Sequence, residues 1–427
     1  MILFQGRTEK RYEECSRDGI AYHRLAVDPD MVARLGWGHN RGLAAAGRRS
    51  WRWLTARLAP NHLERAETAR WRLLLTAQHK ASRQALEQLA PQCLVISDGR
   101  LPNWELPLVK ASQDLNIPTI VPPVALAGDR DTLTRRRSGP ANHGELHPRL
   151  LRDYPTQAIW DPKQRRHVFY YPSQVLPALD SLGMLPPNPW LLGGGLAGLV
   201  LVESEQAREQ RLAQGQDPGR LRVSGHLGHD ILFAGYQRRM ALREELVKSY
   251  GLNPGRPLAV VALPQLGEQG TLDWDNHWRE IRFLAQTFRD LPAEFLISLH
   301  PKMSLSDYRF LNHEYGLRVA NERLSAILPA ADLFLATYSS TVPWATLCRV
   351  PALVFDFYKI DFRLFDDLPG VVTVTEREAL APEVKRILGD QRYWEALRQA
   401  QDQSAPRLSP FDGHCSERIL QALVGDT

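Results

Sequence analysis

The chain has 427 residues, enough for two or three domains and too many for a small module held by disulfides or a metal. Hydrophobic residues make up 44% and charged residues 24%, which excludes a largely disordered or fibrous protein. The formal charge of +5 favours anionic ligands or an anionic membrane surface as partners, and it is too small for a dedicated nucleic-acid binder. Four widely spaced cysteines favour a reducing compartment, so we expect a cytoplasmic protein.

A segment near the start of the chain is rich in Trp and Arg, and its spacing from Ser50 to Leu58 is helical and amphipathic. Two interpretations stay open. The segment lies peripherally on the anionic inner face of a membrane, or it is a core-facing helix with a solvated basic face, which is the commoner arrangement. The longest apolar run, Trp190–Val202, has 13 residues, well short of the roughly 20 that span a bilayer.

Further along, short apolar runs alternate with helical patterns, which is typical of parallel strands in βα units. In the first half of the chain we predict strands at Cys93–Ile96, Ile117–Val121, Leu199–Val202 and Leu221–Val223. In the second half we predict them at Leu258–Leu263, Glu294–Leu299, Leu333–Ala336, Ala352–Phe355 and Val371–Val374. A charged helix, Tyr236–Tyr250, and a cluster of helix-breaking residues separate the two series.

These elements predict an α/β protein with two Rossmann-like, doubly wound domains that face a cleft. The first domain, on the acceptor side, covers residues 1–235. A linker helix and loop follow at 236–257, and the second, nucleotide-binding domain covers 258–400. We expect a last helix in 401–427.

Ligands of open parallel sheets bind beyond the carboxyl ends of the strands, and polar clusters follow several strands of the second domain. The loop after its first strand contains Gln265, Glu268 and glycines that allow close approach of a ligand, or merely make a turn. The next strand is followed by His300, Pro301 and Lys302. A histidine and a lysine there can neutralise a phosphate, although a lone histidine is more often structural.

A third cluster, Ser339, Ser340 and Thr341, precedes a helix with Pro343 in its first turn. This pattern marks a helix start, where free N–H groups and hydroxyls bind anions. Simple capping is the alternative, but it needs one hydroxyl rather than three. Together with His300, the cluster predicts a phosphate pocket at one edge of the sheet.

In the first domain, Asp98 and Gly99 directly follow a predicted strand. Asp98 is either a general base for an acceptor hydroxyl or a cap of the turn. His226, after the strand ending at Val223, is a weaker candidate on the acceptor side. Residues 193–198 satisfy the pattern G-x-G-x-x-G, but no strand precedes them and a strand follows, so we assign no dinucleotide site. We assign no metal either.

Residues 299–301 (Leu-His-Pro), 331–341 and 351–356 resemble the C-terminal domain of GT-B glycosyltransferases. They are most similar to the bacterial capsule and teichoic-acid group, which includes CDP-glycerol glycerophosphotransferases and the Kdo and polysialic acid transferases that use CMP-sugars. The resemblance covers roughly residues 255–425, and in the first half only Ser97-Asp98-Gly99. It implies that His300 and the hydroxyls of 339–341 hold the donor phosphate, and that Asp98 supplies the acceptor base. It also implies that the last helix, in 401–427, crosses back to the first domain.

We therefore expect a metal-independent glycosyltransferase without a cofactor. It would move a sugar, or a glycerol phosphate, from a CMP- or CDP-linked donor to a glycan or lipid-linked acceptor of the bacterial surface, as in capsule polysaccharide biosynthesis. Two alternatives stay open: an isomerase of the UDP-N-acetylglucosamine 2-epimerase type, and an idle GT-B scaffold that binds nucleotide or glycan. The sequence leaves the sugar, the acceptor, the stereochemistry and the oligomeric state open.

Overall fold

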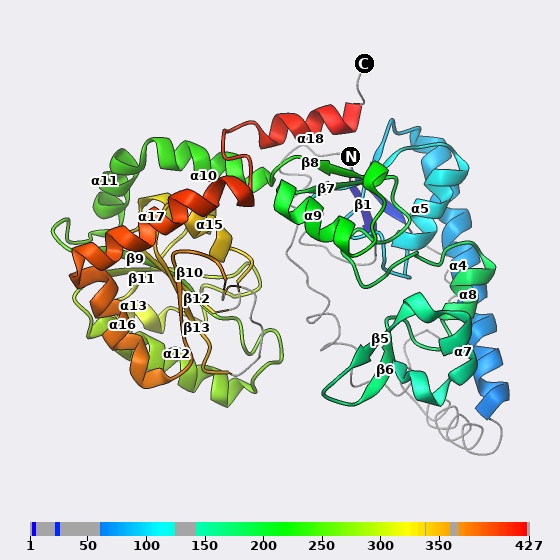
Figure 1. Ribbon diagram of the computed structural model, residues 1–427, viewed down its shortest axis with the longest axis horizontal. Helices are drawn as coiled ribbons and strands as arrows, with labels where there is room; N and C mark the ends of the chain where they lie inside the picture. Colours follow the sequence, from blue (N-terminus) through cyan, green and yellow to red (C-terminus); the bar gives the residue numbers. More distant parts are fainter. Residues whose placement is uncertain are drawn as a thin grey trace. The chain divides into compact units, whose positions relative to one another are not determined.

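The computed structural model describes residues 2–5, 22–25, 60–123, 142–337, 339–358, 365 and 367–424 (Figure 1). The chain separates into two compact units, each considered by itself below. Unit 1 comprises Met1–Leu201, Arg211–Arg222 and Leu423–Thr427, and unit 2 comprises Val202–Gln210 and Val223–Ala422. The amphipathic segment from Ser50 to Leu58 lies outside the described residues.

Unit 2 is built on a six-stranded sheet with the strand order β11-β10-β9-β12-β13-β14, and all its pairs are parallel. The strands are β9 (Leu258–Ala262), β10 (Glu294–Ser298), β11 (Arg318–Val319), β12 (Leu333–Ala336), β13 (Ala352–Phe355) and β14 (Val371–Val374). The chain adds β10 and β11 on one side of β9, and then β12 to β14 on the other. This is the Rossmann order, and the direction of winding reverses between β9 and β12.

Helices cover both faces of this sheet (Figure 1). Side chains alternate along a strand, so Leu258 and Val260 pack into one apolar layer while Ala259 and Val261 pack into the other. The first layer holds α10 (Leu227–Gln237), α11 (Arg239–Tyr250), α14 (Leu324–Ile327) and α15 (Val342–Leu347). The second holds α12 (Trp274–Arg289), α13 (Phe310–Tyr315) and α16 (Arg377–Gly389). With both faces covered, the strand ends are where polar loops gather.

Two helices complete unit 2, α17 (Gln391–Leu408) and α18 (Cys415–Val424). The single last helix predicted in 401–427 is not observed as such. Residue 401 lies inside α17, and the stretch contains the end of α17 followed by α18. Asp230 of α10 fixes the start of α18, because its carboxylate accepts the N–H groups of Cys415 and Ser416 at 2.8 and 2.7 Å. The single helix predicted at 236–250 is likewise two helices, which meet at Arg238.

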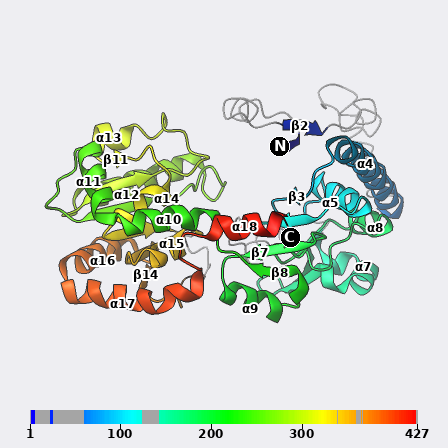
Figure 2. The same ribbon diagram turned by 90° about the horizontal axis from the view of Figure 1, so that it is seen from above.

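The other main sheet has the order β3-β4-β7-β8, with parallel pairs from β3 to β7. Its strands are β3 (Leu94–Val95), β4 (Thr119–Val121), β7 (Leu199–Val202) and β8 (Leu221–Val223). Beside it, α4 (Pro60–Leu89) runs along α5 (Glu105–Asp114) and α8 (Leu176–Ser181) in both views (Figure 2). Hydrogen bonds from His79 to Asp114, 2.9 Å, and from Arg72 to Ser181, 3.0 Å, join these helices.

The remaining elements of the described residues are short. They are the parallel pair β1 (Ile2–Gln5) and β2 (Tyr22–Leu25), the hairpin β5 (Ala158–Asp161) and β6 (Arg166–Phe169), and the helices α7 (Pro148–Asp153) and α9 (Glu205–Ala213). The prediction of an α/β fold with parallel sheets is confirmed, and every predicted strand is observed within two residues of its bounds. None of the helices in the described ranges combines the length and apolarity needed to cross a bilayer.

Candidate functional site

The polar clusters predicted in the second half of the chain follow β9, β10 and β12, which are neighbours in the unit 2 sheet. In a sheet of this order, ligands bind beyond the carboxyl ends of the strands, at the reversal of winding between β9 and β12. The loop with Gln265 and Glu268 and the loop from Ser339 to Thr341 flank that reversal. His300 follows the next strand along the same edge.

The His300 side chain is a neutral imidazole that can donate a hydrogen bond from Nε2. The N–H of Lys302 donates to its Nδ1 at 3.1 Å, so the proton of the neutral ring lies on Nε2. Burial lowers the pKa of His300 from its ordinary value, and repulsion by Lys302 adds to this, while the nearby Glu268 acts in the opposite direction. Nε2 donates to no other described residue. His300 therefore offers a free N–H to a ligand at neutral pH.

Pro301 and Lys302 form an exposed turn behind this imidazole. The N–H of Met303 closes the turn on the carbonyl of His300 at 2.8 Å. The Lys302 ammonium makes no ion pair with any residue in the described part of the chain. It therefore adds a positive charge beside an oriented donor, which suits an anionic ligand.

A chain of hydrogen bonds fixes Glu268. The Gly267 N–H donates to Nδ1 of His277 at 3.2 Å, so the His277 Nε2–H donates to the Tyr308 hydroxyl at 2.9 Å. The Tyr308 hydroxyl donates in turn to Oε1 of Glu268 at 2.6 Å. The other oxygen of Glu268, and the side-chain oxygen of Gln265, are buried without a partner among the described residues. Because buried polar atoms are rarely left unpaired, this loop holds two acceptors ready for a ligand.

The serine cluster holds its hydroxyls together. Ser339 Oγ and Thr341 Oγ1 lie 2.7 Å apart, and the Thr341 N–H donates to Ser339 Oγ at 3.3 Å. Thr341 stands at the start of α15, but its side chain makes no capping hydrogen bond. The helix has only six residues, so its dipole is weak, and the hydroxyls are the main groups here that can meet an anion.

His226 lies in unit 2, although the predicted boundary at residue 235 places it in the first domain. It begins α10, where its Nδ1 accepts the N–H of Gly228 at 2.9 Å. Its ring lies 5.9 Å from that of Trp344, in the first turn of α15. Burial lowers the pKa of His226, so it is a neutral helix cap packed against the helix that follows the serine cluster.

Asp98 lies in unit 1, and the structure explains how its loop is held. Arg100, which is buried, binds both carboxylate oxygens of Asp98, with Nη2 to Oδ2 at 2.9 Å. The buried Glu105 accepts the Ser97 hydroxyl and the Asp98 N–H, both at 3.0 Å. Gly99 takes a positive φ of 76°, which favours glycine. Asp98 is thus an oriented ion-pair partner, and each of its oxygens keeps a second lone pair beside the bond from Arg100.

The glycines of the G-x-G-x-x-G pattern serve backbone packing. A Cβ on Gly195 would lie 1.7 Å from the carbonyl oxygen of Gly99, and one on Gly194 would lie 2.0 Å from that of Asn188. Arg220 donates to the carbonyl of Gly195 at 2.8 Å. The loop and the Asp98 turn are therefore packed backbone to backbone, with no space for a nucleotide between them.

Four residues that hold these side chains in place were not predicted from the sequence: Arg100, Glu105, His277 and Tyr308. Only for Arg100 does the sequence contain a signal that could have found it, because Arg100 stands two positions from Asp98 and carries the opposite charge. Tyr308 is 40 residues from Glu268, and no local pattern links them.

Comparisons with known proteins show the fold. No family model and no curated protein matches the sequence. Among solved structures, the UDP-GlcNAc 2-epimerase from Neisseria meningitidis, bound to UDP-GlcNAc, aligns with 99% of this chain and 91% of its own, at 11% identity and a TM-score of 0.51. The S. aureus MnaA-UDP co-structure aligns with 99% and 95%, at 12% identity and a TM-score of 0.49.

The wall teichoic acid polymerase TagF, in a crystal soaked with CDPG, is also similar, at 20% identity and a TM-score of 0.40. This match covers 53% of the present chain and 56% of TagF, so it spans about half of each. The alignment with the Neisseria enzyme extends over nearly the whole chain, and the unit 2 sheet has the Rossmann strand order. The chain has the GT-B fold, with two Rossmann-like domains.

Proposed function

We propose that the protein is a nucleotide-dependent transferase that binds the phosphate of its donor at the carboxyl edge of the unit 2 sheet. The observation that carries the proposal is the set of polar groups on three neighbouring strand ends that keep hydrogen-bonding capacity for a ligand. These are the Nε2–H of His300, the hydroxyls of residues 339–341 and the buried acceptors of Gln265 and Glu268. Donors for a phosphate and acceptors for hydroxyls are what a nucleotide-linked sugar requires.

In the proposed reaction, an acceptor hydroxyl attacks the anomeric carbon of the donor sugar, and the bond from that carbon to the phosphate oxygen breaks. For a glycerol phosphate donor, the attack is on phosphorus and the bond to the nucleoside phosphate breaks. Either way the leaving phosphate gains negative charge. The neutral Nε2–H of His300 and the Lys302 ammonium stabilise the transition state, in which this charge develops, more than the ground state. This difference lowers the barrier. No step of this scheme requires a metal or a cofactor.

The acceptor proton needs a base, which the resemblance assigns to Asp98. The bidentate pair with Arg100 keeps Asp98 oriented, and the remaining lone pairs of the carboxylate are available to a bound hydroxyl. As acceptor we propose a bacterial surface glycan or its lipid-linked precursor, reached by a protein that is cytoplasmic or peripheral at the inner face of the membrane. This part of the proposal rests on the resemblance to the capsule and teichoic-acid group.

A specific observation favours a second function, epimerisation of a UDP-sugar. Glu268 has one oxygen held by Tyr308 and the other buried and unpaired, which is how a general acid or base is positioned. The fold is also that of a UDP-GlcNAc 2-epimerase, although fold alone does not establish an activity.

Incubation in D₂O separates the two functions. The protein is mixed with UDP-N-acetylglucosamine, CMP-sugars and CDP-glycerol, with and without a glycan acceptor, and followed by NMR and mass spectrometry. A transferase releases nucleotide only when an acceptor is present and leaves the donor C–H bonds untouched. Epimerisation at C2 breaks a C–H bond and places deuterium there without any acceptor. Nucleotide binding with neither product supports the idle scaffold and contradicts the transferase.

A further inference from the structure

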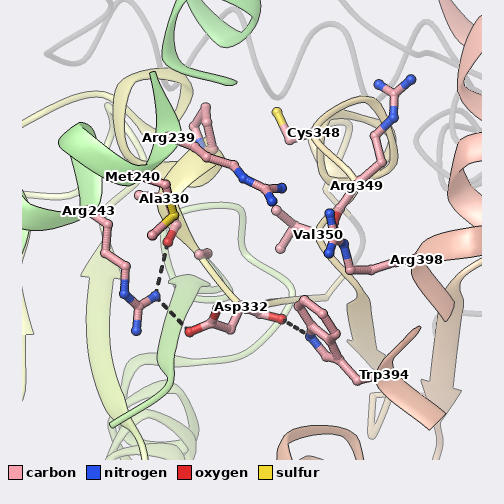
Figure 3. Close-up of a pocket in the computed structure, with 12 residues that line it drawn as sticks. Arg239, Met240, Arg243, Ala330, Asp332, Cys348, Arg349, Val350, Trp394 and Arg398 are labelled. Atoms are coloured by element: carbon pink, nitrogen blue, oxygen red, sulfur yellow. Dashed lines mark hydrogen bonds and ion pairs between the residues drawn. The ribbon is translucent and has the colours of Figure 1, made fainter. Parts of the chain in front are cut away.

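A cavity of about 90 Å³ opens at the other edge of the unit 2 sheet, at the amino ends of β12 and β13 (Figure 3). Asp332, just before β12, and Val350, just before β13, line it together with residues of α11 and α17. The volume holds about three waters at ~30 Å³ each, or one phosphate group. Strands of four residues at ~3.3 Å each separate this cavity from the candidate nucleotide site.

The cavity is lined by more positive than negative charge, with four arginines and one aspartate. Arg243 donates to Asp332 Oδ2 at 2.7 Å, and the same oxygen accepts the Leu258 N–H at 2.8 Å. Arg349 pairs with Asp402 at 2.8 Å, and Figure 3 shows its guanidinium directed away from the other three. The only lining carboxylate is therefore already engaged by Arg243.

Arg239 and Arg398 remain without a carboxylate partner among the described residues. Arg398 lies over the ring of Trp394 at 4.6 Å, and its Nε donates to the carbonyl of Arg349 at 3.1 Å. Trp394 is itself fixed, because its Nε1–H donates to the Asp332 carbonyl at 2.8 Å. In Figure 3 the guanidinium of Arg239 extends into the space between α11 and Val350, toward Arg398. Both side chains are half-buried.

These two like charges act on each other. Partial burial lowers the pKa of Arg398 from its ordinary value and the charge of Arg239 lowers it further, while Tyr236, Asp402 and Asp332 act in the opposite direction. An arginine stays protonated in proteins, so the repulsion persists until an anion enters. A guanidinium stacked on an indole keeps its outer N–H groups in a fixed fork, which matches two oxygens of a phosphate.

We propose that this cavity binds a phosphate group, as a phosphate ester or a pyrophosphate, held between Arg239 on α11 and Arg398 on α17. Such a ligand joins two helices of unit 2 at the edge opposite to the candidate nucleotide site. The proposal does not depend on the function proposed above. A soluble phosphate compound and the headgroup of a phosphate lipid share this chemistry, and the experiment distinguishes them.

Pyrophosphate is titrated by calorimetry into the full-length protein at constant ionic strength, always with His300→Gln present so that the other edge contributes little. Arg239→Gln and Arg398→Gln should each weaken binding at least about 10-fold. Arg398→Lys, which keeps the charge and loses the fork, should also weaken it. The matched control is Arg238→Gln, the neighbouring residue, whose guanidinium is engaged by Glu245 at 2.9 and 3.0 Å on the surface. This control should bind as the parent does.

A second arm uses vesicles of phosphatidylcholine with and without phosphatidic acid. If the protein sediments with vesicles that contain phosphatidic acid, and Arg398→Gln abolishes this while Arg238→Gln preserves it, the ligand is a lipid headgroup. Binding of pyrophosphate alone identifies a soluble ligand. Equal losses in Arg238→Gln and Arg398→Gln would show diffuse charge and overturn the proposal, as would the absence of pyrophosphate and vesicle binding in protein whose circular dichroism matches the parent.

Discussion

Unit 2 contains histidines that are kept neutral by burial, and each uses the neutral form differently. His300 offers Nε2–H to a ligand, His277 passes a hydrogen bond to Tyr308, and His229 accepts two. In each case a donor to Nδ1 selects the tautomer. Protonation of any of them would add a charge where the surroundings disfavour it.

Burial of His229 predicts that the free energy of unfolding decreases as the pH is lowered. Burial, aided by His226, lowers its pKa to about 3, and its Nδ1 accepts from Ser409 at 2.6 Å. The unfolded chain, with a pKa near 6.5, binds this proton first, so the stabilisation is complete above pH 6.5 and is lost as the pH falls toward 3. Between pH 7.5 and 5.5 the loss from this group is about 1.4 kcal/mol.

Urea unfolding at the two pH values measures this effect in the wild type and in His229→Gln. The variant should lose about 1.4 kcal/mol less than the wild type on acidification. His313→Gln, an exposed histidine of α13, is the control and should behave as the wild type. An identical acid response of wild type and His229→Gln would mean that His229 is not the buried neutral group described here.

The hydrogen bond from Tyr308 to Glu268 predicts that removing the Tyr308 hydroxyl lowers turnover more than it lowers the affinity for nucleotide. Tyr308→Phe keeps the apolar ring but frees Oε1 of Glu268 and leaves the His277 N–H unpaired, which should cost about 1–3 kcal/mol of stability. If Glu268 orients the donor sugar, turnover should fall at least about 10-fold while the affinity for the free nucleotide changes little. Steady-state kinetics and calorimetry check this, and equal losses in both would assign Tyr308 a purely structural role.

At the scale of elements, strands and the loops after them were predictable, because buried strands of parallel sheets are short apolar runs. LAVVA at β9 and LFLA at β12 are such runs, and the polar residues after them fall on one sheet edge as expected. The hairpin β5–β6 was not predicted, because its strands are only partly buried and Trp160 is exposed. Its sequence therefore lacks the apolar run that reveals the other strands.

The geometry of the site could not be predicted from the sequence, for a different reason. Glu268, Tyr308 and His277 meet because β9, α12 and the segment after β10 pack together, and their side chains lie 31 and 40 positions apart. Likewise, only the structure shows that Gly195 is required by contact with Gly99 rather than by a ligand. Hydrogen bonds across such separations follow from tertiary packing, which spacing along the chain does not encode.

The glycine loop of unit 1 gives a prediction at this scale. Gly195→Ala places a Cβ 1.7 Å from a backbone oxygen, so the loop must move, at a cost of about 3 kcal/mol or more. Gly198→Ala is the matched control, because its Cβ meets the nearest atom at an ordinary 3.5 Å. Thermal unfolding should show a large loss for the first variant and little for the second. Equal stability of both would contradict the backbone packing described for this turn.

At the scale of the whole molecule, the modest formal charge of +5 gives no hint that unit 2 has two candidate anion sites. One is the carboxyl edge of the sheet with His300 and Lys302, and the other is the amino edge with Arg239 and Arg398. Each combines fixed hydrogen-bond donors with a charge that has no carboxylate partner among the described residues. The composition predicted anionic ligands in general, and we propose these two places for them.

The measurement that tests the central proposal most directly is calorimetric titration of CMP, CDP and UDP into the wild type, His300→Gln and Arg398→Gln. Binding at the carboxyl edge predicts that one of these nucleotides binds the wild type and Arg398→Gln equally. It also predicts a loss of about 10-fold or more in His300→Gln, because a flexible amide replaces the oriented Nε2–H that donates to the charged phosphate. Equal affinity of the wild type and His300→Gln for every nucleotide that binds, or no binding at all, would contradict it.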